Sequence, residues 1–117
     1  MKYRTLGRTD LRVSLVGLGS GGPSQFGQRT GVSESEIHRL VRTALDSGVN
    51  LIDTAAAYGE SEAILGRALH GVPRDTYYIA TKTRPADNGE TISEATLIEQ
   101  VERSLRRLQV DTIDIFQ

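Results

Sequence analysis

Three side chains that could carry chemistry follow the ends of predicted strands. Asp53 comes directly after the short apolar segment Asn50–Ile52, and Lys82 comes directly after the apolar segment Tyr77–Thr81. An ionisable group at the carboxyl end of a buried strand is costly for folding and well placed for catalysis. Lysine is also the basic residue whose pKa changes most readily with burial and with neighbouring charges. The sequence contains only one lysine besides Lys82. Tyr58 follows Asp53 in a loop of small residues, so we expect all three side chains on one rim.

A carboxylate, an ammonium and a phenol can together form a proton donor. A free phenol has a reference pKa of about 10, which is too high for an efficient acid at neutral pH. A neighbouring ammonium favours the phenolate, and a carboxylate holds the ammonium in place. Such a group could protonate a carbonyl oxygen while a hydride adds to the carbonyl carbon. The structural alternative stays open: Asp53 could cap a turn, Tyr58 could pack in a loop, and Lys82 could be a solvated charge.

The elements that must position these residues alternate between strands and helices. Tyr3–Leu6 and Leu11–Ser14 alternate apolar and polar residues around a turn, which predicts a hairpin over residues 1–14. Residues 84–89 are predicted to form a loop. The order predicted after the hairpin is strand 15–19, helix 33–48, strand 50–52, helix 61–70, strand 77–81, helix 93–108 and strand 112–116.

The first predicted helix carries the clearest signals. Ser33 and Glu36 form a capping box at its start, and Gly48 fits the position that follows its last turn. An apolar stripe at helical spacing should face the core. Its members are Ile37, Leu40, Val41, Ala44 and Leu45.

Because each connection carries a helix, the four strands should be parallel, with right-handed crossovers. Two α/β architectures fit: a doubly wound open sheet, or the first half of an eight-stranded (β/α)8 TIM barrel. The charged groups that end the second and third strands favour the barrel, since barrel enzymes build their sites on that rim. A whole barrel takes about 250 residues. Residues 1–117 should therefore form one domain, the first half of a barrel: an N-terminal β-hairpin over 1–14, then four parallel strands and three helices over 15–117.

Glycines follow the first predicted strand, in the run Gly17-x-Gly19-x-Gly21. A dinucleotide fingerprint is rejected, because its glycines lead directly into a helix, whereas here Pro23 and a long loop intervene. Glycines at this place do let a ligand approach the backbone closely. The loop as far as Val32 could be a mobile active-site loop.

Composition excludes several other classes of function. Lys and Arg number 14 against 15 Asp and Glu, so the net charge of −1 offers no electrostatic footprint for nucleic acid. The absence of cysteine excludes a thiolate metal site, and His38 has no partner at ligand spacing, so no metal is expected. No apolar run approaches the ~20 residues of a membrane span, and the N-terminus lacks an apolar signal region. A cytoplasmic protein with no membrane or nucleic-acid partner is expected.

Four ordered motifs, covering essentially the whole chain, resemble the aldo-keto reductase family. Gly48–Ala55 is similar to the family's signature around its catalytic aspartate, and Tyr58-Gly59-x-Ser61-Glu62 is similar to the segment with its catalytic tyrosine. Ile79–Lys82 resembles the strand that ends in the catalytic lysine, and Ser104–Asp114 resembles the third helix and fourth strand. The hairpin fits as the element that closes the bottom of the barrel.

The resemblance implies reduction of small aldehydes or ketones with NADP(H), with NAD(H) as an open alternative. Asp53, Tyr58 and Lys82 would be three of the four catalytic residues, with Tyr58 as the general acid. Non-catalytic NADP(H)-binding or regulatory barrels, such as the ion-channel β-subunits that resemble this family, are the second possibility. The residues that the resemblance assigns to cofactor binding are Gly19, Ser20, Gly21 and Asp53.

The family's fourth catalytic residue is a histidine just after the fourth strand, and the sequence ends at Gln117, short of that position. Neither His38 nor His70 can replace it. We therefore expect residues 1–117 alone to behave as an inactive fragment of a reductase. The first and fourth strands would be open sheet edges, which favour self-association.

Overall fold

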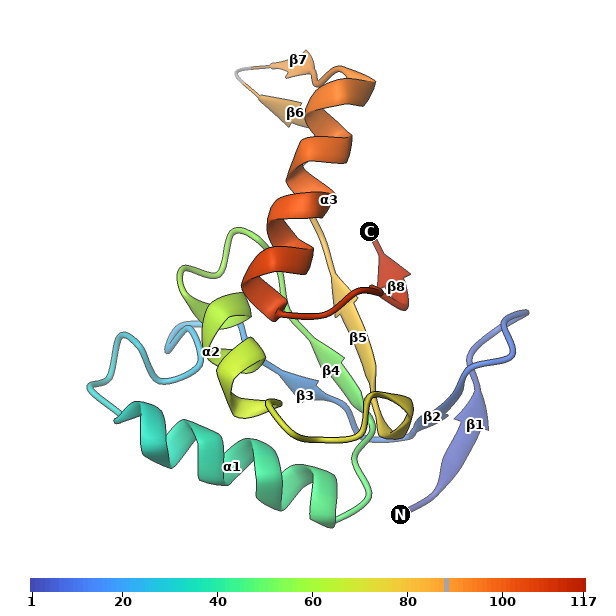
Figure 1. Ribbon diagram of the computed structural model, residues 1–117, viewed down its shortest axis with the longest axis vertical. Helices are drawn as coiled ribbons and strands as arrows, with labels where there is room; N and C mark the ends of the chain where they lie inside the picture. Colours follow the sequence, from blue (N-terminus) through green and yellow to red (C-terminus); the bar gives the residue numbers. More distant parts are fainter. Residues whose placement is uncertain (88) are drawn as a thin grey trace.

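The computed structural model describes residues 1–87 and 89–117, and a four-stranded parallel sheet lies at its centre (Figure 1). The strands lie in the order β3 (Leu18–Gly19), β4 (Leu51–Asp53), β5 (Tyr78–Thr81) and β8 (Ile115–Phe116). The strand order follows the chain order without reversing, so crossovers of one hand place the helices on one face of the sheet. A doubly wound sheet would reverse its order. The architecture is therefore that of a partial (β/α) barrel, as predicted.

Three helices connect these strands. They are α1 (Glu34–Asp46), α2 (Ser61–Ala68) and α3 (Glu94–Leu108), with a short 3-10 turn, η1 (Arg74–Thr76), before β5. Helix α1 packs on α2, and α2 packs on α3. No helix within residues 1–87 or 89–117 has the length and apolar character needed to cross a membrane.

The N-terminal hairpin, β1 (Tyr3–Thr5) paired antiparallel with β2 (Arg12–Ser14), closes the amino end of the sheet. Its contacts are with residues that directly precede β4. The Ser14 amide donates to Asn50 Oδ1 (2.7 Å), and the Asn50 amide donates to Ser14 Oγ (3.0 Å). The Tyr3 hydroxyl donates to the Gly48 carbonyl (2.9 Å). The predicted hairpin is confirmed, and it lies at the end of the sheet opposite to Asp53 and Lys82.

The core fills the space between the sheet and the helices. Ile52 and Ile79 from the two central strands are fully buried. The buried apolar residues that pack together are Phe26, Ile37, Val41, Ile52, Ile64, Leu65, Ala68, Leu69, Tyr77, Ile79 and Leu108.

The stripe of α1 faces this core only in part. Ile37 and Val41 are buried, but Leu40 is 49% exposed, so its prediction as a core residue is wrong. Leu40 lines a surface cavity together with Leu18 of the edge strand β3. Within the described chain α1 has a helical neighbour only in α2, which leaves this side of α1 uncovered.

The predicted strands at the two edges of the sheet are each three residues shorter in the structure. Leu15 and Val16 are more than half exposed, because Ser14 Oγ donates to the Val16 carbonyl (2.7 Å) and the chain bends before it enters the sheet at Leu18. The strand expected over 112–116 contains only Ile115 and Phe116. Ahead of it the Ile79 amide donates to the Asp114 carboxylate (2.7 Å), so a side chain takes the place of a backbone partner.

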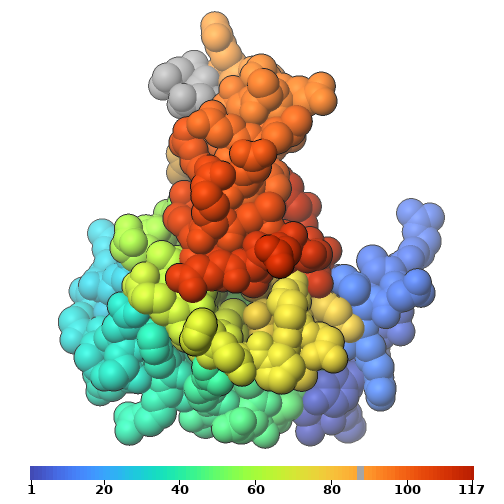
Figure 2. Space-filling model, viewed as in Figure 1, coloured from blue at the N-terminus to red at the C-terminus, as the bar shows by residue number. Residues whose placement is uncertain are grey.

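The segment 84–89, predicted as a loop, contains a short strand. Strand β6 (Ala86–Asp87) pairs antiparallel with β7 (Glu90–Thr91), and the Ile92 amide donates to the Pro85 carbonyl (3.0 Å). Asn88, also within that predicted loop, lies outside the described residues. The β6–β7 pair and the first turns of α3 project from the body of the molecule (Figure 2).

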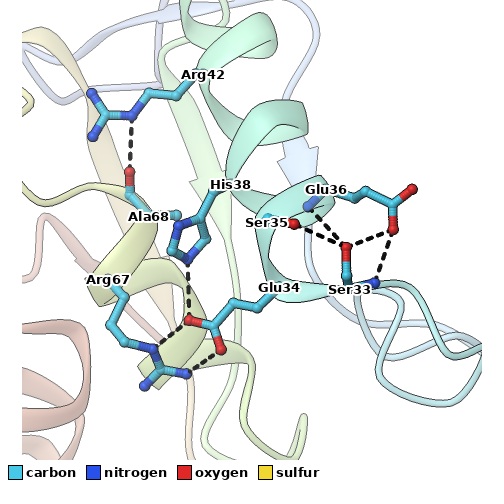
Figure 3. A network of polar contacts seen from close by, with 8 residues as sticks. All are labelled: Ser33, Glu34, Ser35, Glu36, His38, Arg42, Arg67 and Ala68. Carbon is cyan, nitrogen blue, oxygen red and sulfur yellow. Dashed lines mark hydrogen bonds and ion pairs between the residues drawn. The ribbon is translucent and has the colours of Figure 1, made fainter.

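The start of α1 follows the sequence prediction closely (Figure 3). The Glu36 amide donates to Ser33 Oγ (3.3 Å) and the Ser33 amide donates to Glu36 Oε2 (3.0 Å), which completes the capping box. The neighbouring Glu34 binds Arg67 of α2 through two hydrogen bonds, of 2.5 and 3.0 Å. The Arg67 guanidinium lowers the pKa of Glu34, and His38, 3.2 Å away, adds to that effect.

Candidate active site

Asp53 and Lys82 meet at the carboxyl edge of the sheet. Asp53 is the last residue of β4, and Lys82 directly follows β5, its parallel neighbour. Lys82 Nζ lies 2.9 Å from both carboxylate oxygens of Asp53 and 2.9 Å from the Thr54 carbonyl oxygen. All three hydrogens of the ammonium thus have an acceptor, which fixes its position.

Tyr58 lies over this ion pair. Lys82 Nζ is 5.2 Å from the centroid of the Tyr58 ring, within the range of a cation–π contact. The loop that carries Tyr58 is tied to the same edge, since the Ala56 amide donates to the Lys82 carbonyl (3.1 Å). The Tyr58 amide then donates to the Ala55 carbonyl (3.0 Å), which turns the chain toward α2. The structure thus brings together the three side chains that the sequence placed on one rim.

The predicted cofactor-binding residues lie beside this group, in three different environments. Gly19 pairs with Asp53 in the β3–β4 register, and a methyl group at its Cα would meet open space. The Ser20 amide donates to the Asp53 carbonyl (2.9 Å), but the Ser20 side chain is fully buried. At Gly21, a Cβ would lie 2.6 Å from Cε2 of Tyr58, so the ring rests directly on backbone.

An open cleft of about 660 Å³ adjoins Tyr58 and Lys82. Its other walls are the small side chains of Ala55–Ala57 and residues that follow β5, including Thr83 and Arg84. The alanines leave room for a ligand next to the phenol and the ammonium. A small molecule with a polar atom aimed at Tyr58 would fit this space.

Hydroxyl groups supply two further buried polar atoms near Asp53. Ser20 Oγ and Thr54 Oγ1 have no hydrogen-bond partner among the described residues. In that same part of the chain, no three His, Asp or Glu side chains gather closely enough to share a metal ion. The Lys82 ammonium already has three acceptors, so the two hydroxyls are the buried side-chain polar groups at this edge that have no partner among the described residues.

A buried ion pair that the sequence did not predict lies next to the site. Glu62 in α2 is 1% exposed, and its carboxylate accepts hydrogen bonds from Thr81 Oγ1 (2.7 Å) and Arg107 Nε (2.6 Å). Thr81 directly precedes Lys82, so this contact fixes the end of β5 against α2 and α3. Glu62 and Arg107 are 45 residues apart, and no local spacing relates them.

The sequence did not predict a role for Gln28 either. Its side chain reaches from the glycine-rich loop to the turn after Tyr58, where the Glu60 amide donates to Gln28 Oε1 (2.8 Å). In the sequence Gln28 is one polar residue in a polar loop. The length of that loop was the only feature that could have pointed to a functional role for it.

Known proteins that are similar to this chain are aldo-keto reductases or dehydrogenases. The family model described as "Aldo/keto reductase family" matches residues 17–117. The chain is similar to aldo-keto reductase YhdN of Bacillus subtilis (38% identity, all of this chain and 37% of the relative). It is also similar to L-galactose dehydrogenase of Arabidopsis thaliana (38% identity, 98% of this chain and 37% of the relative).

Solved structures agree with this. The thermostable aldo-keto reductase Tm1743, solved with the inhibitor epalrestat, superimposes with a TM-score of 0.83 at 30% identity, over 99% of this chain and 42% of its own. The chain thus spans well under half the length of the proteins that it resembles.

Proposed function

Because the chain belongs to the aldo/keto reductase family of oxidoreductases, we propose that residues 1–117 supply the proton donor of a reductase for small aldehydes or ketones. The observation that supports this is the arrangement of Tyr58 next to the Lys82–Asp53 ion pair, beside an open cleft.

Each of the three side chains has a distinct part in the proposed reaction. The Tyr58 hydroxyl gives its proton to the carbonyl oxygen as negative charge develops there. The Lys82 ammonium, 5.2 Å from the ring centroid, stabilises the phenolate that remains. Asp53 accepts two hydrogen bonds from Lys82 and so holds the ammonium toward the ring. The product is the alcohol, and Tyr58 regains its proton from solvent.

A nicotinamide cofactor, NADPH in this proposal, supplies the hydride that reduces the carbonyl carbon. The edge of the sheet fits such a group, because a Cβ at Gly19 would meet open space and a ligand could approach the backbone closely there. Gly19, Ser20, Gly21 and Asp53 are the residues proposed to hold it. NADH is the alternative cofactor, and the same assay measures its use.

The experiment joins residues 1–117 to the remaining part of the Bacillus subtilis relative and follows NADPH oxidation with an aldehyde substrate. We expect Tyr58→Phe to lower kcat at least about 100-fold, which is the size of a general-acid contribution. Tyr78→Phe is the matched control, since Tyr78 lies in β5 and does not line the cleft. A Tyr58→Phe chimera within about threefold of its parent would exclude Tyr58 as the acid.

A second measurement uses residues 1–117 themselves. Titration with NADPH should shift the backbone amide resonances of Gly19 and Asp53 in NMR spectra, and it should leave those of the distant hairpin unchanged. A chimera without turnover, together with no shift at either residue, would contradict the proposal.

A further inference from the structure

The side chain of Gln28 lies between the glycine-rich loop and the turn that follows Tyr58. Its Nε2 lies within hydrogen-bond distance of three acceptors, which its two N–H groups share: the Gln25 carbonyl (2.6 Å), Ser61 Oγ (2.9 Å) and the Tyr58 carbonyl (3.2 Å). Its Oε1 accepts from the Glu60 amide (2.8 Å). The orientation of the amide is fixed by chemistry, because the Glu60 N–H can only donate and the two carbonyls can only accept.

The turn itself is shaped to receive this side chain. Gly59 has φ +57°, and a Cβ there would lie 2.7 Å from Gln28 Oε1. A larger residue at position 59 would therefore be strained and would also displace the glutamine. One amide group thus holds Tyr58, Glu60 and Ser61 in a single arrangement.

The same loop also holds the ring of Tyr58. The ring lies on the backbone at Gly21, where a Cβ would come within 2.7 Å of both Cε2 and Cζ. Ser61 Oγ donates to the Ser20 carbonyl (3.0 Å), and the Ser20 amide donates to the Asp53 carbonyl (2.9 Å). A continuous set of hydrogen bonds therefore runs from Gln28 to the strand end that carries Asp53.

From these contacts we infer that Gln28 is a positioning residue, which holds the Tyr58 phenol next to the Lys82 ammonium. The inference rests on the proposed function for its catalytic consequence, but the placement of the ring can be measured without any reaction. A purely structural role would make Gln28 contribute to stability only. A positioning role requires in addition that the ring leaves Lys82 when the Gln28 amide is lost.

The first experiment measures the ring directly in residues 1–117. Lys82 Nζ lies 5.2 Å from the centroid of the Tyr58 ring, so the NMR resonance of the neighbouring Lys82 Hε protons should carry a ring-current shift. The Tyr58→Leu variant gives the same resonance without the aromatic ring. Gln28→Met keeps the length of the side chain and removes every hydrogen bond. Gln28→Glu keeps the acceptor for the Glu60 amide and loses the donors. We expect both variants to lose much of the ring-current shift at Lys82.

Thr30→Val is the matched control, because it removes a hydrogen bond to Gly27 within the same loop and does not touch the turn after Tyr58. The control should keep the Lys82 shift of the parent chain. Circular dichroism melts show which variants are folded, and either glutamine variant alone suffices for the comparison. An unchanged Lys82 shift in a folded Gln28 variant would overturn the inference.

The second experiment places the same substitutions in the chimera described above. Loss of positioning should lower kcat roughly tenfold or more, while KM for the aldehyde changes by less than about twofold. A lost ring-current shift with an unchanged kcat would support the positioning of Tyr58 by Gln28 and would count against Tyr58 as the acid. The two proposals can therefore fail separately.

Discussion

Substitution of Gly66 by alanine gives the sharpest test of the packing between α2 and α3. Gly66 lies in the last turn of α2 and is buried. A Cβ at this position would lie 2.5 Å from the Arg107 carbonyl oxygen and 2.8 Å from both the carbonyl carbon and the carbonyl oxygen of Leu108. These are backbone atoms at the end of α3, so a side-chain rotation cannot relieve the contact.

Two opposing effects decide the result. Alanine is favoured over glycine in a helix interior by about 1 kcal/mol. Overpacking against an unyielding neighbour costs about 3 kcal/mol at the upper end of its usual range. The net loss in the free energy of unfolding should be about 2 kcal/mol. With an unfolding entropy of roughly 2.1 cal/mol/K per residue, this corresponds to a Tm about 8 °C lower for a chain of this length.

The assay is a thermal melt of Gly66→Ala followed by circular dichroism, together with urea unfolding. Ala63→Gly in the same helix is the control for helix propensity, and it should lower Tm by about 4 °C. A Gly66→Ala chain that melts at or above the parent temperature would refute the reasoning, since propensity would then outweigh the contact with α3.

Three further predictions concern charges and caps outside the cleft. Ser33→Ala removes the α1 cap and should cost about 1 kcal/mol in urea unfolding, with Ser33→Asp restoring most of it. Arg107→Ala leaves the buried Glu62 carboxylate without its ionic partner. Because Arg107 is 38% exposed, we expect a loss of about 2 kcal/mol, below the range for a fully buried pair, and Arg107→Lys should recover part of it. Glu34 has a lowered pKa in the folded chain, mainly through its hydrogen bonds from Arg67. The stabilisation that ionised Glu34 gives to the folded chain is therefore complete above the ordinary glutamate pKa of about 4.3. It is lost as the pH falls through the lower pKa that Glu34 has in the folded chain. Between about pH 6 and about pH 3, Tm should fall less for Glu34→Gln than for the parent chain. An equal fall in Tm would contradict this interpretation of the ion pair.

The sequence predicted the elements where one local rule dominated. The capping box of Ser33 and Glu36 set the start of α1, and the helical spacing of Ile37 and Val41 set its buried side. Alternation of β and α segments predicted parallel strands in chain order, which the sheet confirms. Because the carboxyl ends of parallel strands all lie at one edge, the same pattern was enough to place Asp53 next to Lys82.

Predictions failed where particular contacts, rather than the hydrophobicity of the residue, decided the outcome. Leu15 and Val16 are as apolar as a buried strand, but a hydrogen bond from Ser14 bends the chain before the sheet begins. Leu40 follows the helical spacing of its stripe and stays exposed, since among the described residues α1 has a helical neighbour on one side only. The spacing of hydrophobic residues indicates which of them could be buried. Which of them are buried depends on the elements that pack against them.

The types and the order of the reactive groups were thus determined by the sequence alone: a carboxylate and an ammonium at successive strand ends, with a phenol in the loop between them. Tertiary structure decided how these groups are held. Glu62 meets Arg107 across 45 residues, and Gln28 meets the Tyr58 carbonyl across 30. Contacts between distant segments leave no periodic trace in a sequence, because each partner satisfies only its own local rules. Only the packed chain brings their donors and acceptors within hydrogen-bond distance.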